Sequence, residues 1–117
     1  MKQVSSALMD VSLRRTMIGD VHVLVVDGSV DIATVPQLSD ALSRLVTDTR
    51  GQTCAVDIDG ARVFDDTALG VLLGAAGRAR STGGDLIVVC TIEKLRLRLN
   101  ETRFDQAVLV RSTIADV

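Results

Sequence analysis

The amino-acid sequence predicts a single α/β domain, in which an antiparallel β-hairpin is followed by parallel strands in one mixed β-sheet with helices packed on it. Two apolar segments flank the pair Gly19-Asp20, which has the composition of a tight hairpin turn with glycine first. Further along the chain, short apolar runs alternate with helical patterns, as in β-α-β units. The 117 residues, 47% of them hydrophobic, suffice for one domain with a substantial core and are too few for two.

The predicted hairpin consists of strands over Met9–Ile18 and Val21–Val26. Three apolar positions of the first strand share one face: Met9, Val11 and Leu13. The pair Asp27-Gly28 is expected to end or bend the second strand, because both residues favour turns.

A helix is predicted to begin at Thr34. Thr34 is a good N-cap, Pro36 is tolerated in the first turn, and Gln37 completes a capping box. Asp40 and Arg44, four residues apart, are expected to form an ion pair on the outer surface. The apolar residues fall on one face: Val35, Leu38, Ala41, Leu42, Leu45 and Val46.

In the second half of the chain, the apolar pattern predicts a buried strand at Cys54–Ile58, a helix at Ala68–Arg80 and a central parallel strand at Asp85–Thr91. Three glycines recur along this helix: Gly70, Gly74 and Gly77. Each weakens an isolated helix by about 1 kcal/mol relative to alanine. We expect close approach of the helix to the sheet to compensate for this loss.

The segment Glu93–Asn100 is ambiguous, because three leucines alternate with two arginines in a strand period. We favour a helix, since a parallel strand that leaves the sheet needs a crossover before the next strand. Leu95 and Leu99 also form an i,i+4 pair. A short last strand is predicted at Val108–Val110.

Composition excludes several classes of function. The formal net charge of −2 provides no general attraction for nucleic acid or an anionic membrane, and only two residues are aromatic. No signal peptide and no run of about 18–20 apolar residues is evident, so we expect a cytoplasmic protein without membrane insertion. Cys54 and Cys90 lie in apolar runs and are expected to be buried free thiols.

Convincing catalytic chemistry is absent from the sequence. It contains neither type of glycine-rich nucleotide motif, and the lone His22 is expected to be a structural strand residue. Two cysteines and one histidine far apart do not form a typical zinc site. The carboxylate pairs Asp57/Asp59 and Asp65/Asp66 lack an accompanying base or further metal ligands. We therefore expect no enzyme activity, no cofactor and no metal, and a small enzyme or nucleotide-binding module is a disfavoured alternative.

The junction between the third strand and its helix is the most informative part of the chain. Asp65 and Asp66 stand where the helix begins, and an almost wholly apolar stretch follows. Carboxylates at that place accept hydrogen bonds from unpaired backbone N–H groups and interact favourably with the helix dipole. A phosphate group would be held there equally well.

Two segments together resemble the STAS domain family, which includes anti-sigma factor antagonists and the tails of sulphate transporters. The run from Asp27 to Leu38, DGSVDIATVPQL, resembles the family's G-E-L-D-x-A-T-x-P-x-L opening. The run from Val56 to Gly74 resembles its V-D-L…F-x-D-S-S-G-L-G-V-L-L-G segment. The similarity spans roughly residues 11–110, and it implies one STAS domain over residues 1–117 with a core at about 9–110.

The resemblance implies a phosphorylation site that this chain has altered. In family antagonists, the partner anti-sigma factor is a kinase that phosphorylates the serine after the first aspartate of D-S-S-G or D-S-T-G. Here Asp65 matches that aspartate, Asp66 the phosphoacceptor serine, Thr67 the next hydroxyl residue and Ala68 the glycine. Asp66 cannot form a stable phosphate ester, and its single charge is smaller than the −1.5 to −2 of phosphoserine.

Three consequences of this change remain open. The protein is fixed in a weakly binding state that mimics the phosphorylated one, its partner has adapted to the carboxylate, or Thr67 has become the phosphoacceptor.

The function expected from the resemblance is that of a phospho-independent anti-sigma factor antagonist that binds a kinase-like anti-sigma factor. The alternative is an accessory STAS subunit of a transporter or of a stress-sensing assembly. A homodimer is compatible with either. Loops gather at one edge of an α/β sheet, so we expect the partner to contact the two motif loops and the early exposed face of the following helix. The expected contact residues are Ser29, Asp31, Thr34, Asp65, Asp66, Thr67 and Ala68.

Overall fold

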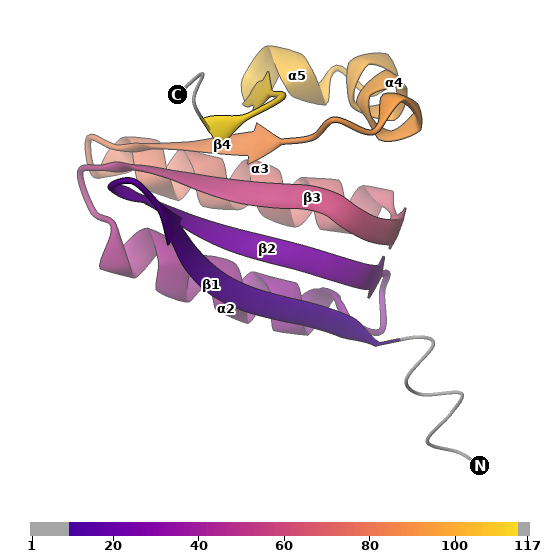
Figure 1. Ribbon diagram of the computed structural model, residues 1–117, viewed down its shortest axis with the longest axis horizontal. Helices are drawn as coiled ribbons and strands as arrows, with labels where there is room; N and C mark the ends of the chain where they lie inside the picture. Colours follow the sequence, from indigo (N-terminus) through magenta and orange to yellow (C-terminus); the bar gives the residue numbers. More distant parts are fainter. Residues whose placement is uncertain (1–9, 115–117) are drawn as a thin grey trace.

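The computed structural model describes residues 10–114, and these form a five-stranded sheet in the order β1-β2-β3-β4-β5 (Figure 1). β1 and β2 pair antiparallel, and each later neighbour pairs in parallel. The predicted α/β class, with a hairpin followed by parallel strands, is confirmed. The bounds of the strands are Val11–Ile18 for β1, Val21–Val30 for β2, Thr53–Phe64 for β3, Asp85–Val89 for β4 and Leu109–Arg111 for β5.

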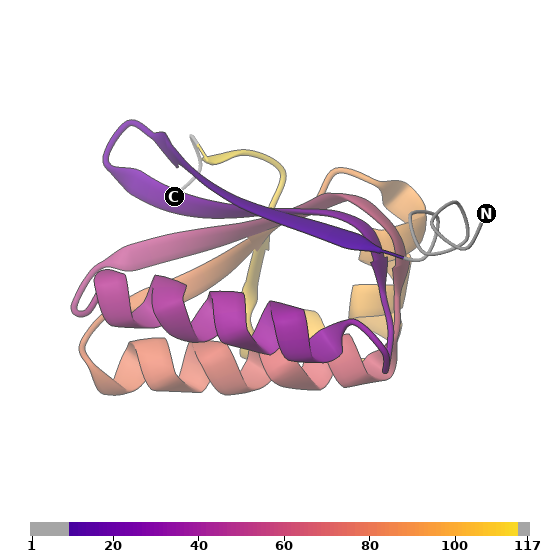
Figure 2. The ribbon, with the colours of Figure 1, turned by 90° about the horizontal axis from the view of Figure 1, so that it is seen from below.

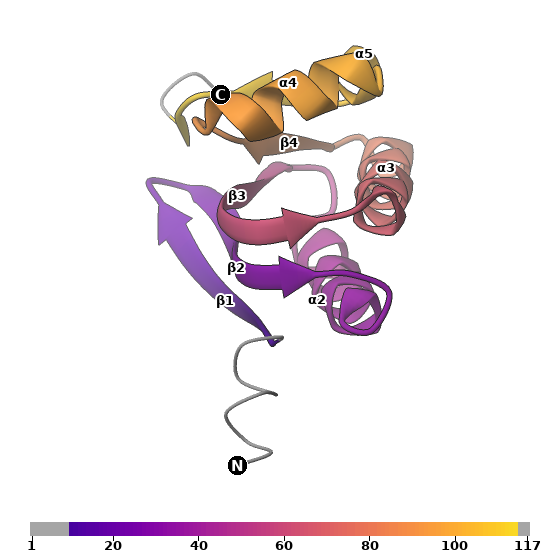
Figure 3. The same ribbon diagram turned by 90° about the vertical axis from the view of Figure 1, so that its right-hand side faces the viewer.

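Helices α2 (Val35–Asp48) and α3 (Asp66–Ser81) lie side by side across one face of the sheet (Figure 2). Helices α4 (Glu93–Glu101) and α5 (Phe104–Ala107) stand at the edge formed by β4 and β5 (Figure 3). The main core fills the space between the sheet and the helices and is built mostly from Val, Leu, Ile and Ala. Within residues 10–114, no helix is long and apolar enough to cross a membrane.

The hairpin confirms the predicted turn, since Gly19 has a φ of 60° and Ile18 pairs with Val21. Met9, which we expected in β1, lies outside the described residues. β2 bends at Gly28, where φ is 95°, and continues to Val30 instead of stopping at Val26. Parallel pairing with β3, through two shifts of register, carries both strands past their turn-forming residues.

The segment after β4 is a helix, as predicted. The burial of its three leucines follows the helical period. Leu95 and Leu99 turn toward the core, whereas Leu97 is 56% exposed. A strand would have placed all three on one face. The short helix α5 was not predicted, because four residues carry little periodicity, and β5 begins one residue later than expected.

Helix α2 has the predicted amphipathic pattern. Leu38, Leu42, Leu45 and Val46 are buried against the sheet and α3. The predicted surface ion pair is also present, with 2.6 Å between Arg44 Nη2 and Asp40 Oδ2. Both side chains are largely exposed, so the pair contributes no more than a few tenths of a kcal/mol.

The glycines of α3 do not approach the sheet, and that expectation is wrong. Gly70, Gly74 and Gly77 are exposed, and the face toward the core carries alanine and leucine instead. A Cβ atom added at Gly70 or Gly77 would meet no heavy atom within 4 Å. Packing within residues 10–114 therefore offers no compensation for these two glycines.

We expect Gly70→Ala and Gly77→Ala each to stabilise the folded chain by about 1 kcal/mol, because alanine loses less backbone entropy in a helix. Urea denaturation followed by circular dichroism measures this change. A decrease in the free energy of unfolding for either variant would contradict the open space seen beside these residues.

The two cysteines are buried free thiols, as predicted, with Cys54 in β3 and Cys90 directly after β4. Cys54 pairs with Leu86, so Cys90, directly after the end of β4, lies four residues further along the chain than this partner. At about 3.3 Å per residue this offset is roughly 13 Å, which is too long for a disulfide. Burial raises the pKa of both thiols.

Thiol counting is expected to find two free thiols after the oxidised, folded protein is denatured. Ellman's reagent should react slowly with the native protein, because the attacking thiolate is scarce and enclosed. Because burial favours the protonated form of both thiols, their ionisation destabilises the folded state. The free energy of unfolding is therefore unaffected by the thiols below the unfolded pKa of about 8.5 and declines at higher pH. A monomer without free thiols would show that the strand register is wrong.

Candidate functional site

The loop between β2 and α2 is held in a fixed shape by its own polar side chains. Asp31 Oδ1 accepts hydrogen bonds from the backbone N–H groups of Ala33 (2.9 Å) and Thr34 (3.2 Å). The Thr34 hydroxyl donates to the Ser29 carbonyl oxygen at 2.8 Å and accepts from the Asp31 N–H at 3.1 Å. These bonds leave Ile32 at the tip of the loop, 79% exposed.

This arrangement corrects the predicted capping box. Thr34 is the N-cap residue of α2, but its side chain makes no capping hydrogen bond. Its hydroxyl is occupied by the loop, so the box expected between Thr34 and Gln37 is not formed. Asp31, three residues before the helix boundary, supplies the acceptor for the Thr34 N–H instead.

The loop between β3 and α3 begins directly beside the first loop. The Asp65 N–H donates to the Val30 carbonyl oxygen at 3.2 Å, because Val30 and Phe64 are paired at the ends of their strands. Asp65 is the N-cap of α3, and its Oδ1 accepts from the Ala68 N–H at 3.2 Å. The cap is thus Asp65, and Asp66 lies in the first turn.

Asp66 forms an ion pair that the sequence did not predict. Its Oδ1 lies 2.6 Å from Nη2 of Arg98, which projects from α4. The Asp66 side chain is 84% exposed and that of Arg98 is 34% exposed. An ion pair this exposed contributes about 0–1 kcal/mol to stability. Its main consequence is to place a positive charge directly beside the position that resembles a phosphoacceptor.

The seven predicted contact residues fall into two groups. Asp66 and Thr67 are exposed, and Asp31 and Asp65 are partly exposed at the same edge. Ser29, Thr34 and Ala68 are buried. A hydrogen bond between Thr34 and Ser29 supports the first loop. The exposed Ile32 was not singled out from the sequence, although its place directly after Asp31 in a loop was visible there.

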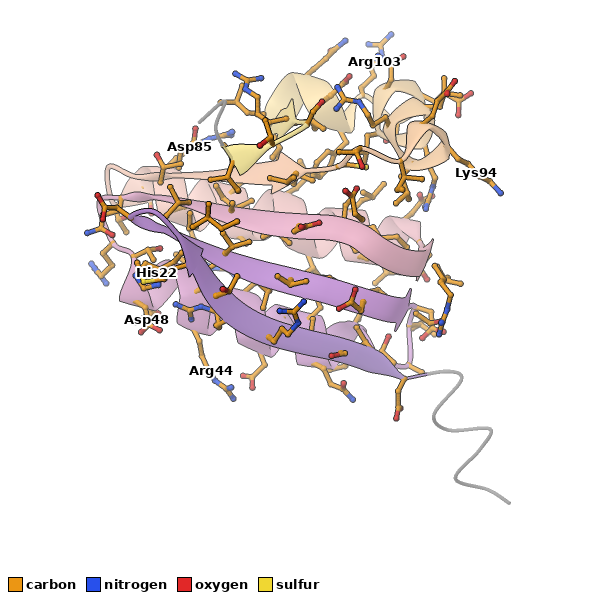
Figure 4. The ribbon with its side chains drawn as sticks, viewed as in Figure 1. His22, Arg44, Asp48, Asp85, Lys94 and Arg103 are labelled. Atoms are coloured by element: carbon orange, nitrogen blue, oxygen red, sulfur yellow. The ribbon has the colours of Figure 1, made fainter. Side chains whose placement is uncertain are left out.

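The other candidate groups lie away from these loops or have structural partners. Asp59, within β3, accepts the Thr91 N–H at 2.6 Å and the Thr91 hydroxyl at 2.7 Å. Asp57 accepts the Asp59 N–H, so both carboxylates of this pair belong to the sheet and have structural partners. Figure 4 shows His22 at the opposite end of the sheet, where its Nδ1 lies 3.0 Å from Arg15 Nη2.

Taken together, these features define a small α/β domain that presents two ordered, adjoining loops and a helix N-terminus at one sheet edge. Such an edge suits recognition of another molecule. The family model of the STAS domain matches residues 13–117. The chain therefore belongs to the STAS domain family.

Solved structures share this fold at low sequence identity. An anti-sigma factor antagonist from Mycobacterium paratuberculosis superposes with a TM-score of 0.80 at 21% identity, covering 91% of this chain and 89% of that one. A putative anti-sigma factor antagonist from Thermotoga maritima gives 0.77 at 19% identity, covering 89% of each chain.

The phosphorylated form of the Bacillus cell fate determinant SpoIIAA gives 0.64 at 15% identity, covering 90% of this chain and 95% of that one. Identities this low show the shared fold alone. Among curated protein sequences, none matches the chain.

Proposed function

We propose that this protein is an anti-sigma factor antagonist, which acts by binding a kinase-like anti-sigma factor and carries out no catalysis of its own. The observation that carries the proposal is the meeting of the two motif loops, joined by the hydrogen bond from the Asp65 N–H to the Val30 carbonyl oxygen. Membership of the STAS family and the fold shared with solved antagonists support it.

The proposed partner surface consists of the accessible residues at that edge. Asp31 and Ile32 come from the first loop, and Asp66 and Thr67 from the start of α3. Together they combine negative charge with one exposed branched apolar side chain, and such a mixture favours a protein partner over a nucleic acid. Gly70, one turn further along α3, extends the surface with an exposed residue, where an added Cβ would meet no heavy atom of residues 10–114 within 4 Å.

Regulation at this surface is proposed to be independent of phosphorylation at residue 66. A carboxylate stands where the family resemblance places a serine, and it cannot accept phosphate in a stable ester. Its charge is also engaged by Arg98 within the same chain. The partner therefore meets a permanently charged and internally paired residue at this position, in place of a switchable one.

Affinity capture from a native lysate tests the proposed function. The wild-type chain is used as bait beside an Asp66→Arg bait, and the bound proteins are identified by mass spectrometry. We expect a kinase-like anti-sigma factor to be enriched on the wild type and depleted on the variant. Enrichment of a permease or of transport ATPase subunits would instead support the accessory-subunit function.

A further inference from the structure

A groove of about 470 Å³ lies beside the proposed partner surface, between the end of β3 and the start of α4. Its lining is mostly apolar and includes Val63, Ile92 and Leu95. Val63 and Ile92 are 46% and 43% exposed, although both are branched apolar residues. The volume falls in the range of pockets that hold ligands.

The lining of this groove also includes three cationic residues: Arg62, Lys94 and Arg98. Arg98 is paired with Asp66. The side chains of Arg62 and Lys94 make no hydrogen bond or ion pair with the rest of residues 10–114, and Figure 4 shows Lys94 extending away from α4. The two acids of the lining, Asp59 and Asp65, already accept hydrogen bonds from Thr91 and Ala68.

We propose that this groove docks an extended segment of a partner protein that carries branched apolar and acidic side chains. Apolar side chains would cover the exposed Val63 and Ile92, and carboxylates would meet the charges of Arg62 and Lys94. A phosphodiester backbone fits less well, because Asp59, Asp65 and Asp66 lie at the same edge.

Arg98 lines the groove and also pairs with Asp66 in the first turn of α3. A partner carboxylate that takes Arg98 must compete with Asp66 for the same guanidinium group. Removing the charge of Asp66 should therefore strengthen docking of an acidic segment. If Asp66 itself contacted the segment, removing its charge would instead weaken docking.

Selection from a random peptide library displayed on phage tests the proposal without assuming any particular partner. The folded chain is the target, and the selected peptides are synthesised with a fluorescent label for anisotropy measurements. We expect enrichment of peptides that combine Asp or Glu with Leu, Ile or Val. Their dissociation constants should rise at least tenfold for Arg62→Glu/Lys94→Glu, and should fall for Asp66→Asn.

Arg14→Glu/Arg50→Glu is the matched control, because it makes the same change of net charge at exposed residues outside the groove. We expect it to leave the affinity within twofold. Amide resonances of Val63 and Ile92 should shift on titration with a selected peptide.

Enrichment of basic or uncharged peptides, no enrichment, or equal losses in both double variants would overturn the proposal. Shifts at these residues with small organic carboxylates but with no selected peptide would assign the groove to a metabolite and overturn it as well. The selection contains no anti-sigma factor, so a negative result leaves the capture experiment of the proposed function unaffected.

Discussion

The variant Asp66→Arg is expected to bind the cognate anti-sigma factor at least tenfold more weakly than the wild type, a loss of about 1.4 kcal/mol. The side chain is 84% exposed at the start of α3, so reversing its charge changes the surface without disturbing the core. The new guanidinium would also face Arg98, and the repulsion would shift both side chains. Isothermal titration calorimetry with the purified partner measures the change.

Asp48→Arg provides a matched control for this charge reversal. Asp48 also pairs with an arginine, at 3.1 Å from Arg15 Nη1, and its side chain is 57% exposed. It lies at the opposite end of the molecule from the two loops (Figure 4). Equal affinities for wild type, Asp66→Arg and Asp48→Arg would remove the loop edge from the partner surface.

Asp31 lies at the same edge but requires a different design. Its carboxylate accepts two backbone N–H groups within its own loop, so Asp31→Arg would remove a turn as well as a charge. Asp31→Asn keeps an oxygen acceptor for those bonds and removes only the charge. A tenfold loss for Asp31→Arg with little loss for Asp31→Asn would assign the effect to loop shape. Similar losses for both would assign it to charge.

Local patterns predicted the elements of the fold because most of these elements depend on neighbouring residues. The glycine-first turn at Gly19 and the i,i+4 pair Leu95/Leu99 both describe contacts within a few residues. The lengths of β2 and β3 were underestimated for the opposite reason. Their last pairs, such as Val30 with Phe64, join residues far apart in the sequence and outweigh local turn preferences.

In the candidate site, too, features set by neighbouring residues were predicted, and features set by long-range packing were not. That Asp65 and Asp66 stand at a helix start followed from the sequence, but which of them is the cap depended on the exact helix boundary. Arg98 could not be assigned, because 32 residues separate it from Asp66 and their contact depends on how α4 packs at the sheet edge. The exposed side of Gly70 and Gly77 likewise depends on which face of α3 meets the sheet.

The ion pair with Arg98 disfavours one of the three consequences left open for Asp66. Pairing within the chain offsets part of the negative charge that a partner would meet at residue 66. A residue whose charge is offset in this way is a poor mimic of phosphoserine, which carries −1.5 to −2. This pairing argues against a protein fixed in a state that mimics the phosphorylated one.

The variant Asp66→Ser is expected to become a substrate of the partner, provided that the partner retains kinase activity, whereas the wild type takes up no label at residue 66. The serine hydroxyl would stand exposed in the first turn of α3. Its phosphate would lie near the unpaired backbone N–H groups of that turn and within reach of Arg98, an arrangement that favours a doubly charged group. Incubation with the partner and radiolabelled ATP, followed by peptide mapping, measures both halves of the prediction.

Two further variants make the location of the label unambiguous. Asp66→Ala should remain unlabelled, and Asp66→Ser/Thr67→Val should be labelled as strongly as Asp66→Ser alone. Thr67 is exposed beside residue 66, so label on wild-type Thr67 would identify this hydroxyl as the switch and contradict phospho-independent regulation. If a partner with demonstrated kinase activity labels none of the variants, residue 66 is not presented to its active site, and the proposed correspondence with the family's phosphoacceptor is wrong.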